Sequence, residues 1–279
     1  MPPARTEPVI ITLTTDFGTS DSYVAQMKGV ILGINAKVRI VDISHGVLPQ
    51  QILQATFSTQ TAWPYFPPGA VHVAVVDPGV GSDRRPIVLH TQQGIFVGPD
   101  NGVLSAGLPD GVRPDEPRRI PLTEHASAFE ISDARYIQER VSNTFHGRDV
   151  FAPAATHLAL GVAPEELGPA VDEVMALPLI RAVEQADGTF EAQVVHIDRF
   201  GNVITSMRVE DLAAGEFSLQ VGDHSVPGPF ETYSQMPGLG ALAGSSGYLE
   251  IAAPNGSAAE TLGVEIGARV RLQPEGSSS

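Results

Sequence analysis

The sequence contains no cysteine among its 279 residues. Disulfide bonds, thiolate metal sites and a cysteine nucleophile are therefore excluded. Positive charge is also scarce, because 17 lysine and arginine residues stand against 32 aspartate and glutamate residues, for a formal net charge of −15. No basic run occurs, which argues against nucleic acid as the main partner, since phosphate neutralisation needs clustered cations.

Long apolar segments are absent too. No stretch approaches the ~20 apolar residues that cross a membrane, and no apolar core follows a basic start in the first 20 residues. We therefore expect no membrane span, no signal peptide and a cytoplasmic location. No internal repeat is present, and a hydrophobic content of 42% is enough to bury one large core, or a large and a smaller one.

The first half of the chain alternates short apolar runs with helical patterns, and the two periods predict strands and helices respectively. We expect strands at 9–14, 38–43 and 70–76, a hairpin from 86–90 and 94–97, and helices at 23–32, 52–63 and 151–160. Asp21 or Ser22 is the expected cap of the first helix. Such alternation is typical of an α/β fold, in which helices cover both faces of a mostly parallel sheet.

The pattern changes after residues 163–179, where Pro, Glu and Gly collect. Beyond them only strands are predicted, at 190–197, 203–207, 217–221, 247–252 and 268–272. Turn residues separate these strands, which is typical of a small β-barrel or sandwich. We therefore predict a Rossmann-like sheet domain over residues 1–181, a boundary near Ala182, and a small β-barrel domain over residues 182–279. The polar tail from Pro274 to Ser279 is expected to be disordered.

Four polar clusters follow predicted strands or lie in adjoining loops. They are Thr15-Asp16-Phe17-Gly18 with Asp21, Asp77-Pro78-Gly79-Val80-Gly81 with Arg84, Phe145-His146-Gly147-Arg148-Asp149, and Asp198-Arg199-Phe200-Gly201-Asn202. In open α/β sheets, ligands bind outside the carboxyl ends of the strands. Three clusters belong to the sheet domain and the fourth is a turn of the β domain, so a site between the domains would collect all four.

Each candidate also has a structural alternative. Asp16 can accept hydrogen bonds from a ribose diol, but an aspartate at this place is equally a turn or cap residue. Asp77 with Arg84 is, by itself, more often a structural ion pair than a catalytic one. His146 can hold or move a proton near neutral pH, although a lone loop histidine is usually a surface residue.

Familiar cofactor motifs are missing. Gly79-Val80-Gly81 does not continue into a dinucleotide fingerprint, no Lys-Ser or Lys-Thr ends a phosphate loop, and no His-Glu-x-x-His occurs. The dispersed carboxylates and His146 leave a metal site as a weaker alternative. We expect neither a metal nor a cofactor.

Six short motifs occur in order along the chain. They are Thr15-Asp16-Phe17-Gly18-Thr19-Ser20-Asp21, Val76-Asp77-Pro78-Gly79-Val80-Gly81, Gly98-Pro99-Asp100-Asn101-Gly102, Thr144-Phe145-His146-Gly147-Arg148-Asp149, Ile197-Asp198-Arg199-Phe200-Gly201-Asn202 and Gly244-Ser245-Ser246-Gly247-Tyr248-Leu249. Together they resemble the S-adenosylmethionine (SAM) hydrolase family, also called SAM hydroxide adenosyltransferases, which are related to fluorinating and chlorinating enzymes. The resemblance runs from about Val9 to Leu272.

The resemblance implies an enzyme that cleaves SAM to adenosine and L-methionine by attack of hydroxide at C5′. It maps a water-activating set onto Asp77, Arg84 and His146. Hydroxide is scarce at pH 7 because the pKa of water is ~15.7. Arg84 is therefore expected to stabilise the anion, Asp77 to orient Arg84 and the water, and His146 to accept or relay the proton.

The resemblance also implies substrate contacts. Asp16 is expected on the ribose hydroxyls, Asp21 and Asp198 on the methionine ammonium, Ser245 on its carboxylate, Asn202 on the adenine edge, Phe200 and Tyr233 stacked on the ring, and Asn255 and Gly256 as backbone contacts to the adenine. Relatives are trimers with the site between subunits. A homotrimer is therefore implied, in which Asp198 and Asn202 act on the adjacent subunit's substrate.

The sequence departs from the halogenating relatives in two places. Val80 and Gly147 stand where those enzymes hold the halide with small hydroxyl side chains, and residues 86–102 are too few for their additional loop. Both differences favour water as the nucleophile, while the effect of Leu48-Pro49-Gln50 after the second strand stays open. The alternatives are a SAM-dependent halogenase, a non-catalytic adenosine- or SAM-binding module, and a metal-dependent hydrolase.

Overall fold

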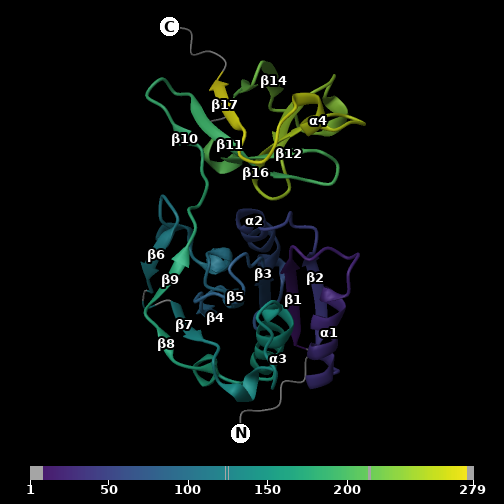
Figure 1. Cartoon of the computed structure of the whole chain (residues 1–279). Helices are drawn as coiled ribbons and strands as arrows, with labels where there is room; N and C mark the ends of the chain where they lie inside the picture. Colours follow the sequence, from purple (N-terminus) through teal and green to yellow (C-terminus); the bar gives the residue numbers. More distant parts are fainter. Residues whose placement is uncertain (1–8, 123, 125, 213–214, 275–279) are drawn as a thin grey trace. The chain divides into compact units, whose positions relative to one another are not determined.

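A computed structural model describes residues 9–122, 124, 126–212 and 215–274. Contacts divide the chain into two compact units, Met1–Leu179 and Ile180–Ser279, and the path of the chain through both can be followed in Figure 1. The expected disorder at 275–279 lies outside the described residues. Pro274, which was predicted to belong to the tail, is instead the last residue of strand β17.

The N-terminal unit is built on a seven-stranded sheet with the order β2-β1-β3-β5-β4-β7-β8. Its strands are β1 (Ile10–Thr15), β2 (Arg39–Ser44), β3 (Val71–Val75), β4 (Pro86–Thr91), β5 (Gly94–Pro99), β7 (Ala126–Glu130) and β8 (Ala170–Val171). The predicted strands and the hairpin of the first half are all present. A separate two-stranded sheet pairs β6 (Arg118–Pro121) with β9 (Glu173–Ala176), which the sequence reading did not foresee.

The sheet is mixed, and the prediction of a mostly parallel sheet was wrong in this respect. β2, β1, β3 and β5 run parallel to one another, whereas β4 pairs antiparallel with β5 and with β7, and β7 pairs antiparallel with β8. The reason is the turn at Gln92-Gln93, because two residues can join antiparallel strands but cannot form the crossover that parallel strands need. The parallel strands β1 and β3 carry two of the four polar clusters at their carboxyl ends.

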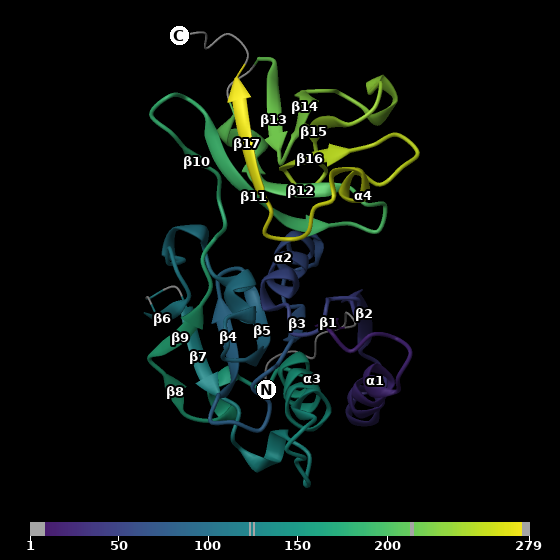
Figure 2. The same ribbon diagram turned by 45° about the horizontal axis from the view of Figure 1, so that its top comes forward.

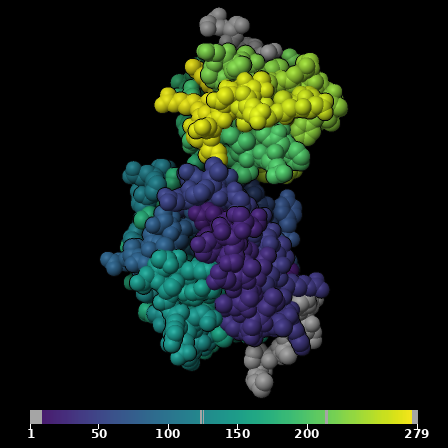
Figure 3. Space-filling model, turned by 45° about the vertical axis from the view of Figure 1, so that its right-hand side comes forward, coloured from purple at the N-terminus to yellow at the C-terminus, as the bar shows by residue number. Residues whose placement is uncertain are grey.

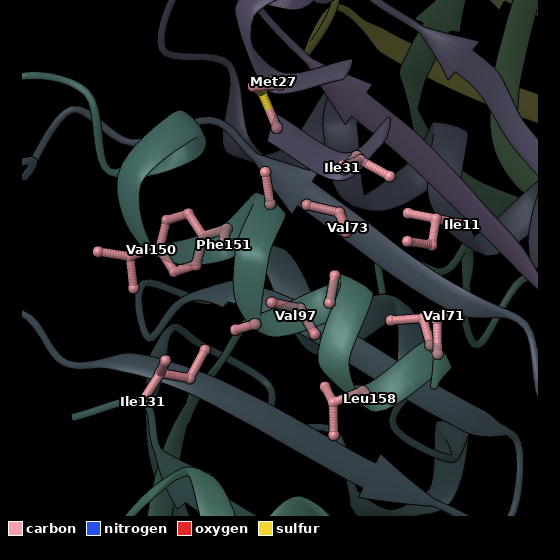
Figure 4. Packing of buried hydrophobic residues seen from close by; sticks show 14 of the residues in the cluster. Ile11, Met27, Ile31, Val71, Val73, Val97, Ile131, Val150, Phe151 and Leu158 are labelled. Carbon is pink, nitrogen blue, oxygen red and sulfur yellow. The ribbon is translucent and has the colours of Figure 1, made fainter. Parts of the chain in front are cut away.

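Helices cover both faces of this sheet. Helices α1 (Tyr23–Ile34) and α3 (Ala152–Ala159) pack with inward side chains of β1 and β3 into one buried cluster, shown in Figure 4. Helix α2 (Ile52–Ala62) contributes to a second cluster with alternate residues of β3, β4 and β5. In the space-filling view the purple surface of the α1 region adjoins the teal surface of the later part of this unit (Figure 3).

Helix α1 begins at Tyr23 as predicted, whereas the start of the third helix differs from the prediction. Ser22 is the N-cap residue of α1, but its hydroxyl accepts a hydrogen bond from the Gln26 side chain and makes no cap hydrogen bond. The third helix was expected at residues 151–160, but its first turn already begins at Gly147. Residues Gly147–Phe151 form a π-helical turn that continues into α3.

The C-terminal unit is an eight-stranded antiparallel sheet that curls into a nearly closed barrel (Figure 2). Its strands are β10 (Val183–Glu184), β11 (Phe190–Ile197), β12 (Val203–Arg208), β13 (Phe217–Val221), β14 (His224–Gly228), β15 (Gly240–Ala243), β16 (Tyr248–Ala252) and β17 (Arg269–Pro274). All five strands predicted here are present, and inward apolar side chains form one core. The expectation that only strands follow was wrong, because α4 (Ala258–Leu262) lies between β16 and β17.

No helix in the described parts of the chain is long and apolar enough to cross a membrane.

Gly98 gives a test of the packing of the N-terminal unit. A Cβ atom at Gly98 would lie 2.3 Å from the Ala74 carbonyl oxygen, on the neighbouring strand. We expect Gly98→Ala to lower the free energy of unfolding by about 3 kcal/mol, because backbone atoms cannot move aside cheaply. Urea unfolding followed by fluorescence of Trp63, the chain's single tryptophan, measures this.

Gly29→Ala is the matched control. Gly29 is exposed in the interior of α1, and a Cβ atom there meets nothing within 4 Å. The control is expected to raise stability by about 0.5–1 kcal/mol, because alanine favours the helix. Equal unfolding midpoints for the two variants would contradict the proposed packing at Gly98.

Candidate active site

A cavity of about 420 Å³ opens at the carboxyl ends of β1 and β3. Its walls come from the segments after β1, β2 and β3 and from the loop that leads into α3. The lining residues are Asp16, Phe17, Tyr23, Pro49, Gln50, Val75, Asp77, Pro78, Val80, Thr144, Phe145, His146 and Gly147. Three of the four polar clusters found in the sequence therefore meet around one cavity.

Asp77 and Arg84 form a buried ion pair beside this cavity. The Arg84 Nε donates to both Asp77 carboxylate oxygens at 3.0 Å, and Nη2 donates to Oδ2. Only 6% of the Asp77 side chain and 9% of the Arg84 side chain are exposed. The Arg84 guanidinium also lies over the Phe151 ring, 5.3 Å from its centre. Such a forked, desolvated pair holds both groups in one orientation.

His146 joins the pair through the same guanidinium. Arg84 Nη2 lies 2.7 Å from His146 Nδ1, and because a guanidinium can only donate, Nδ1 must be the acceptor. The imidazole is then neutral and carries its proton on Nε2. Burial lowers the pKa of His146 and the Arg84 charge lowers it further, while Asp77 and Asp149 act in the opposite direction.

Two local features bring the β3 loop and the α3 loop together. Gly81 has a φ of +78°, and a Cβ atom there would lie 2.5 Å from the Asn143 carbonyl oxygen, so only glycine permits this close approach. Asp149 is buried and accepts hydrogen bonds from the Ser142 backbone N–H and the Arg148 side chain. These contacts fix the loop that presents His146.

Asp16 also lines the cavity and anchors the loop after β2. Its Oδ2 accepts a hydrogen bond of 2.9 Å from the backbone N–H of Gln50, a residue with a positive φ of 67°. No other hydrogen bond to the Asp16 carboxylate is made by the described residues, so lone pairs remain for a ligand. The segment Leu48-Pro49-Gln50, whose role the sequence left open, thus forms part of the cavity wall.

Aromatic rings line a further part of the cavity. Phe17, Tyr23 and Phe145 contact one another with ring centres 5.2–5.9 Å apart. The faces of these rings offer a cationic ligand favourable electrostatic contact. Asp21, in contrast, is exposed and does not belong to the cavity lining.

In the C-terminal unit, Asp198 organises its own turn. Its Oδ1 accepts from the backbone N–H groups of Phe200 and Asn202, and its Oδ2 accepts from the Asn202 side-chain amide. Phe200 is thereby held 77% exposed at the tip, while Asn202 is buried. The structure therefore brings these three predicted residues together in one turn, which supplies a structural explanation for Asp198.

Tyr233 contacts Glu250, a residue that was not predicted from the sequence. Its hydroxyl donates to the Glu250 carboxylate at 2.7 Å, and that contact and partial burial raise the pKa of Tyr233 to about 12. Glu250 is buried on β16, and burial raises its pKa, as does the charge of Asp198. A glutamate within the apolar run Tyr248–Ala252 was the available signal.

The other predicted contacts lie in turns. Ser245 is exposed in the turn between β15 and β16, where the Gly247 N–H donates to the Gly244 carbonyl. Asn255 has a positive φ of 57°, and Gly256 follows it with its N–H bonded to the Ala253 carbonyl. Across the described residues, no three histidine, aspartate or glutamate side chains gather closely enough to hold a metal ion.

Comparison with known sequence families gives two matches. The SAM hydroxide adenosyltransferase N-terminal domain matches residues 11–168, and the C-terminal domain of the same family matches residues 192–271.

Individual relatives agree with this assignment. Two proteins named (R)-S-adenosyl-L-methionine hydrolase are similar over most of the chain. The protein from Salinispora tropica is 38% identical, covering 94% of this chain and 97% of its own, and the one from Thermus thermophilus is 40% identical, covering 92% and 97%. A fluorinase from an Actinoplanes species is 27% identical over 75% of each chain. The crystal structure of an uncharacterized conserved protein from Thermotoga maritima matches with a TM-score of 0.84 at 30% identity, covering 94% of this chain and 99% of that chain.

The protonation of His146 gives a prediction of pH dependence. Its pKa is lowered in the folded chain, so below the unfolded value of about 6.5 the unfolded chain binds more protons. We therefore expect this histidine to contribute a loss of unfolding free energy as the pH falls through 6.5 towards the lower folded value. Urea unfolding of wild type and His146→Asn between pH 7.5 and 5 measures the difference.

The imidazole titration itself, followed by NMR, provides the direct check. Its midpoint is expected below 6.5. A midpoint above 6.5 would mean that His146 is stabilised as a cation and does not accept from Arg84.

Proposed function

Because the chain belongs to the SAM hydroxide adenosyltransferase family, we propose that it hydrolyses SAM to adenosine and L-methionine by attack of water at C5′. The observation that carries the proposal is the shared Arg84 guanidinium, which holds Asp77 and His146 side by side at the cavity wall. The names of the relatives indicate the (R) sulfonium form as the substrate to test first.

The proposed chemistry uses an acceptor and a donor around one water molecule. The Asp77 carboxylate accepts a hydrogen bond from the water, and the Nε2–H of His146 donates one to its oxygen. Arg84 holds both groups in place and balances the carboxylate charge. In this assignment His146, which was expected to accept or relay the proton, holds the water instead, because its Nδ1 already accepts a hydrogen bond from Arg84.

In the proposed step one bond to C5′ forms and one breaks. The water oxygen forms a bond to C5′ while the C5′–S bond breaks, and the sulfonium sulfur takes the electron pair and becomes the neutral thioether of methionine. The water proton passes to Asp77 and then to solvent. Since a sulfonium leaves readily, aiming the oxygen along the C5′–S axis is the main requirement.

Water fits this site better than a halide ion. The hydroxyl side chains expected in a halogenase are replaced by Val80 and Gly147. A Cβ atom at Gly147 would lie 3.2 Å from carbons of the Phe17 and Phe145 rings and 3.3 Å from the Met27 sulfur. A serine at this position would therefore require the aromatic wall to move.

We further propose the substrate contacts that the resemblance implies. Asp16 binds the ribose hydroxyls, with Asn202 and Phe200 on the adenine and Tyr233 stacked beside it. Ser245 contacts the methionine carboxylate, and Asn255 and Gly256 offer backbone groups to the adenine. Asp198 acts mainly by holding its turn, and Asp21 remains a prediction that the cavity lining does not support.

We also propose the domain type, the assembly and the location that the family resemblance implies. The N-terminal unit serves as a Rossmann-like domain, and the protein is a cytoplasmic homotrimer whose active sites lie between subunits. No metal or separate cofactor takes part. Sedimentation at equilibrium, which would give three times the chain mass, addresses the assembly.

Incubation with SAM in ¹⁸O-labelled water tests the reaction. We expect labelled adenosine and L-methionine in equal amounts, unchanged by added chloride or by a chelator. Only halogenated nucleoside would show a halogenase, activity lost with the chelator would show a metal enzyme, and binding without turnover would show a binding module.

Adjacent arginines give matched variants for this experiment. Arg84→Lys removes the fork that joins Asp77 and His146, so kcat is expected to fall by about 100-fold or more. Arg85→Lys is the control, because Arg85 bonds Asp100 and lies outside the proposed set. Equal kcat values for the two variants would contradict the role of Arg84.

A further inference from the structure

The two loops that form one wall of the cavity are tied together beyond the ends of their strands. The pairing of β1 with β2 shifts register after Leu13 and ends at Thr14 and Ser44. Thr15 pairs on its other side with β3, and β2 offers it no backbone partner. Side-chain contacts take over at this point.

His45 supplies these contacts. Its Nδ1 lies 2.8 Å from the Thr15 hydroxyl, and its carbonyl oxygen accepts a 2.8 Å hydrogen bond from the Gly18 N–H. Both side chains are buried, Thr15 to 0% exposure and His45 to 7%. The Asp42 carboxylate lies 3.1 Å from His45 Nε2, and Lys28 binds the other oxygen of Asp42.

The two hydrogen bonds of the Thr15 hydroxyl have one consistent direction, while Asp42 lies at ion-pair distance from His45 Nε2 without a hydrogen bond to it. The Phe17 N–H donates to the Thr15 oxygen, which leaves the hydroxyl hydrogen to donate to His45 Nδ1. The nearby Asp42 carboxylate favours the remaining imidazole proton on Nε2. The order Asp, His and Thr is that of a nucleophilic triad, but the fully buried Thr15 cannot reach a substrate.

We infer that Asp42, His45 and Thr15 form a positioning relay that fixes the Asp16 carboxylate for the ribose diol. Asp16 lies between Thr15 and Phe17, and the Phe17 N–H donates a hydrogen bond to the Thr15 hydroxyl. The relay therefore fixes the peptide units on both sides of Asp16. The Gln50 N–H then fixes one carboxylate oxygen of Asp16. The inference rests on the proposed role of Asp16 and adds residues that do not line the cavity.

Thr15→Val tests the relay. Valine has nearly the same shape but can neither accept from Phe17 nor donate to His45. We measure dissociation constants of adenosine and of 2′,3′-dideoxyadenosine by calorimetry. For Thr15→Val the preference for adenosine is expected to shrink about tenfold, the ratio that corresponds to ~1.4 kcal/mol, and KM for SAM to rise more than kcat falls. Thr15→Ser, which keeps the hydroxyl, is expected to restore most of the preference.

Thr12→Val is the matched control, because Thr12 is another fully buried threonine on β1 that contacts a buried histidine, His72, at 2.9 Å. It is expected to lower stability without changing the preference for adenosine. If the relay is merely structural, both valine variants will have lower stability and an unchanged preference for adenosine over 2′,3′-dideoxyadenosine. That result would overturn the inference.

Two further outcomes separate the inference from the proposed function. If the wild type does not prefer adenosine over the dideoxy compound, the ribose role of Asp16 is wrong and the relay inference falls with it. If the wild type shows the preference and Thr15→Val keeps it, only the relay is wrong. Should Thr15→Val not fold, the partly exposed Asp42→Asn provides the same comparison, with a reduced preference expected and an unchanged one contradicting the relay.

Discussion

The arrangement of the cavity depends on one buried cation. Arg84 contacts a carboxylate from the end of β3 and an imidazole from the start of the α3 segment. One planar group thus fixes the loop after β3 to a residue 62 positions beyond Arg84 in the chain. Leaving any of the three without its partner would strand a polar group away from water, at a cost of about 1–3 kcal/mol or more. The catalytic geometry and the stability of this region are therefore difficult to separate.

Another part of the cavity lining is also held by a few buried hydrogen bonds. Asp16 presents one oxygen to the Gln50 N–H, and the backbone on either side of it is held by Thr15 and His45. A ligand-binding carboxylate on a loop gains precision only when the loop itself is immobilised. Here the immobilising groups Thr15 and His45 are buried away from water, which keeps their hydrogen bonds effective.

Much of the framework could be predicted from the sequence because local signals agreed with the tertiary structure. The β-branched run at 10–15 became a strand, and the polar residues after it reached the cavity as strand ends in an α/β sheet should. Short elements were missed although their signals existed. Helix α4 has a capping Ser257 and a left-handed Gly263, but five residues carry too little periodicity to stand out.

Other features of the site follow from packing and could not be predicted. That His146 Nδ1 accepts from Arg84 depends on the close approach of two loops at Gly81. The burial of Glu250 under Tyr233 likewise depends on the fold of the barrel. The presence of a carboxylate in a motif also does not reveal its hydrogen-bond partners. Both carboxylate oxygens of Asp198 accept hydrogen bonds from residues of its own turn.

The π-helical turn at Gly147–Phe151 has a consequence for how this region tolerates changes in chain length. A π turn holds one residue more than the α-helical turn that it replaces. Removing one residue from this turn would let helix α3 continue regularly, with its buried side chains in place, while the preceding chain rotated and withdrew His146 from Arg84. A single codon deletion here would thus leave the core side chains of α3 in place but break the contact between His146 and Arg84.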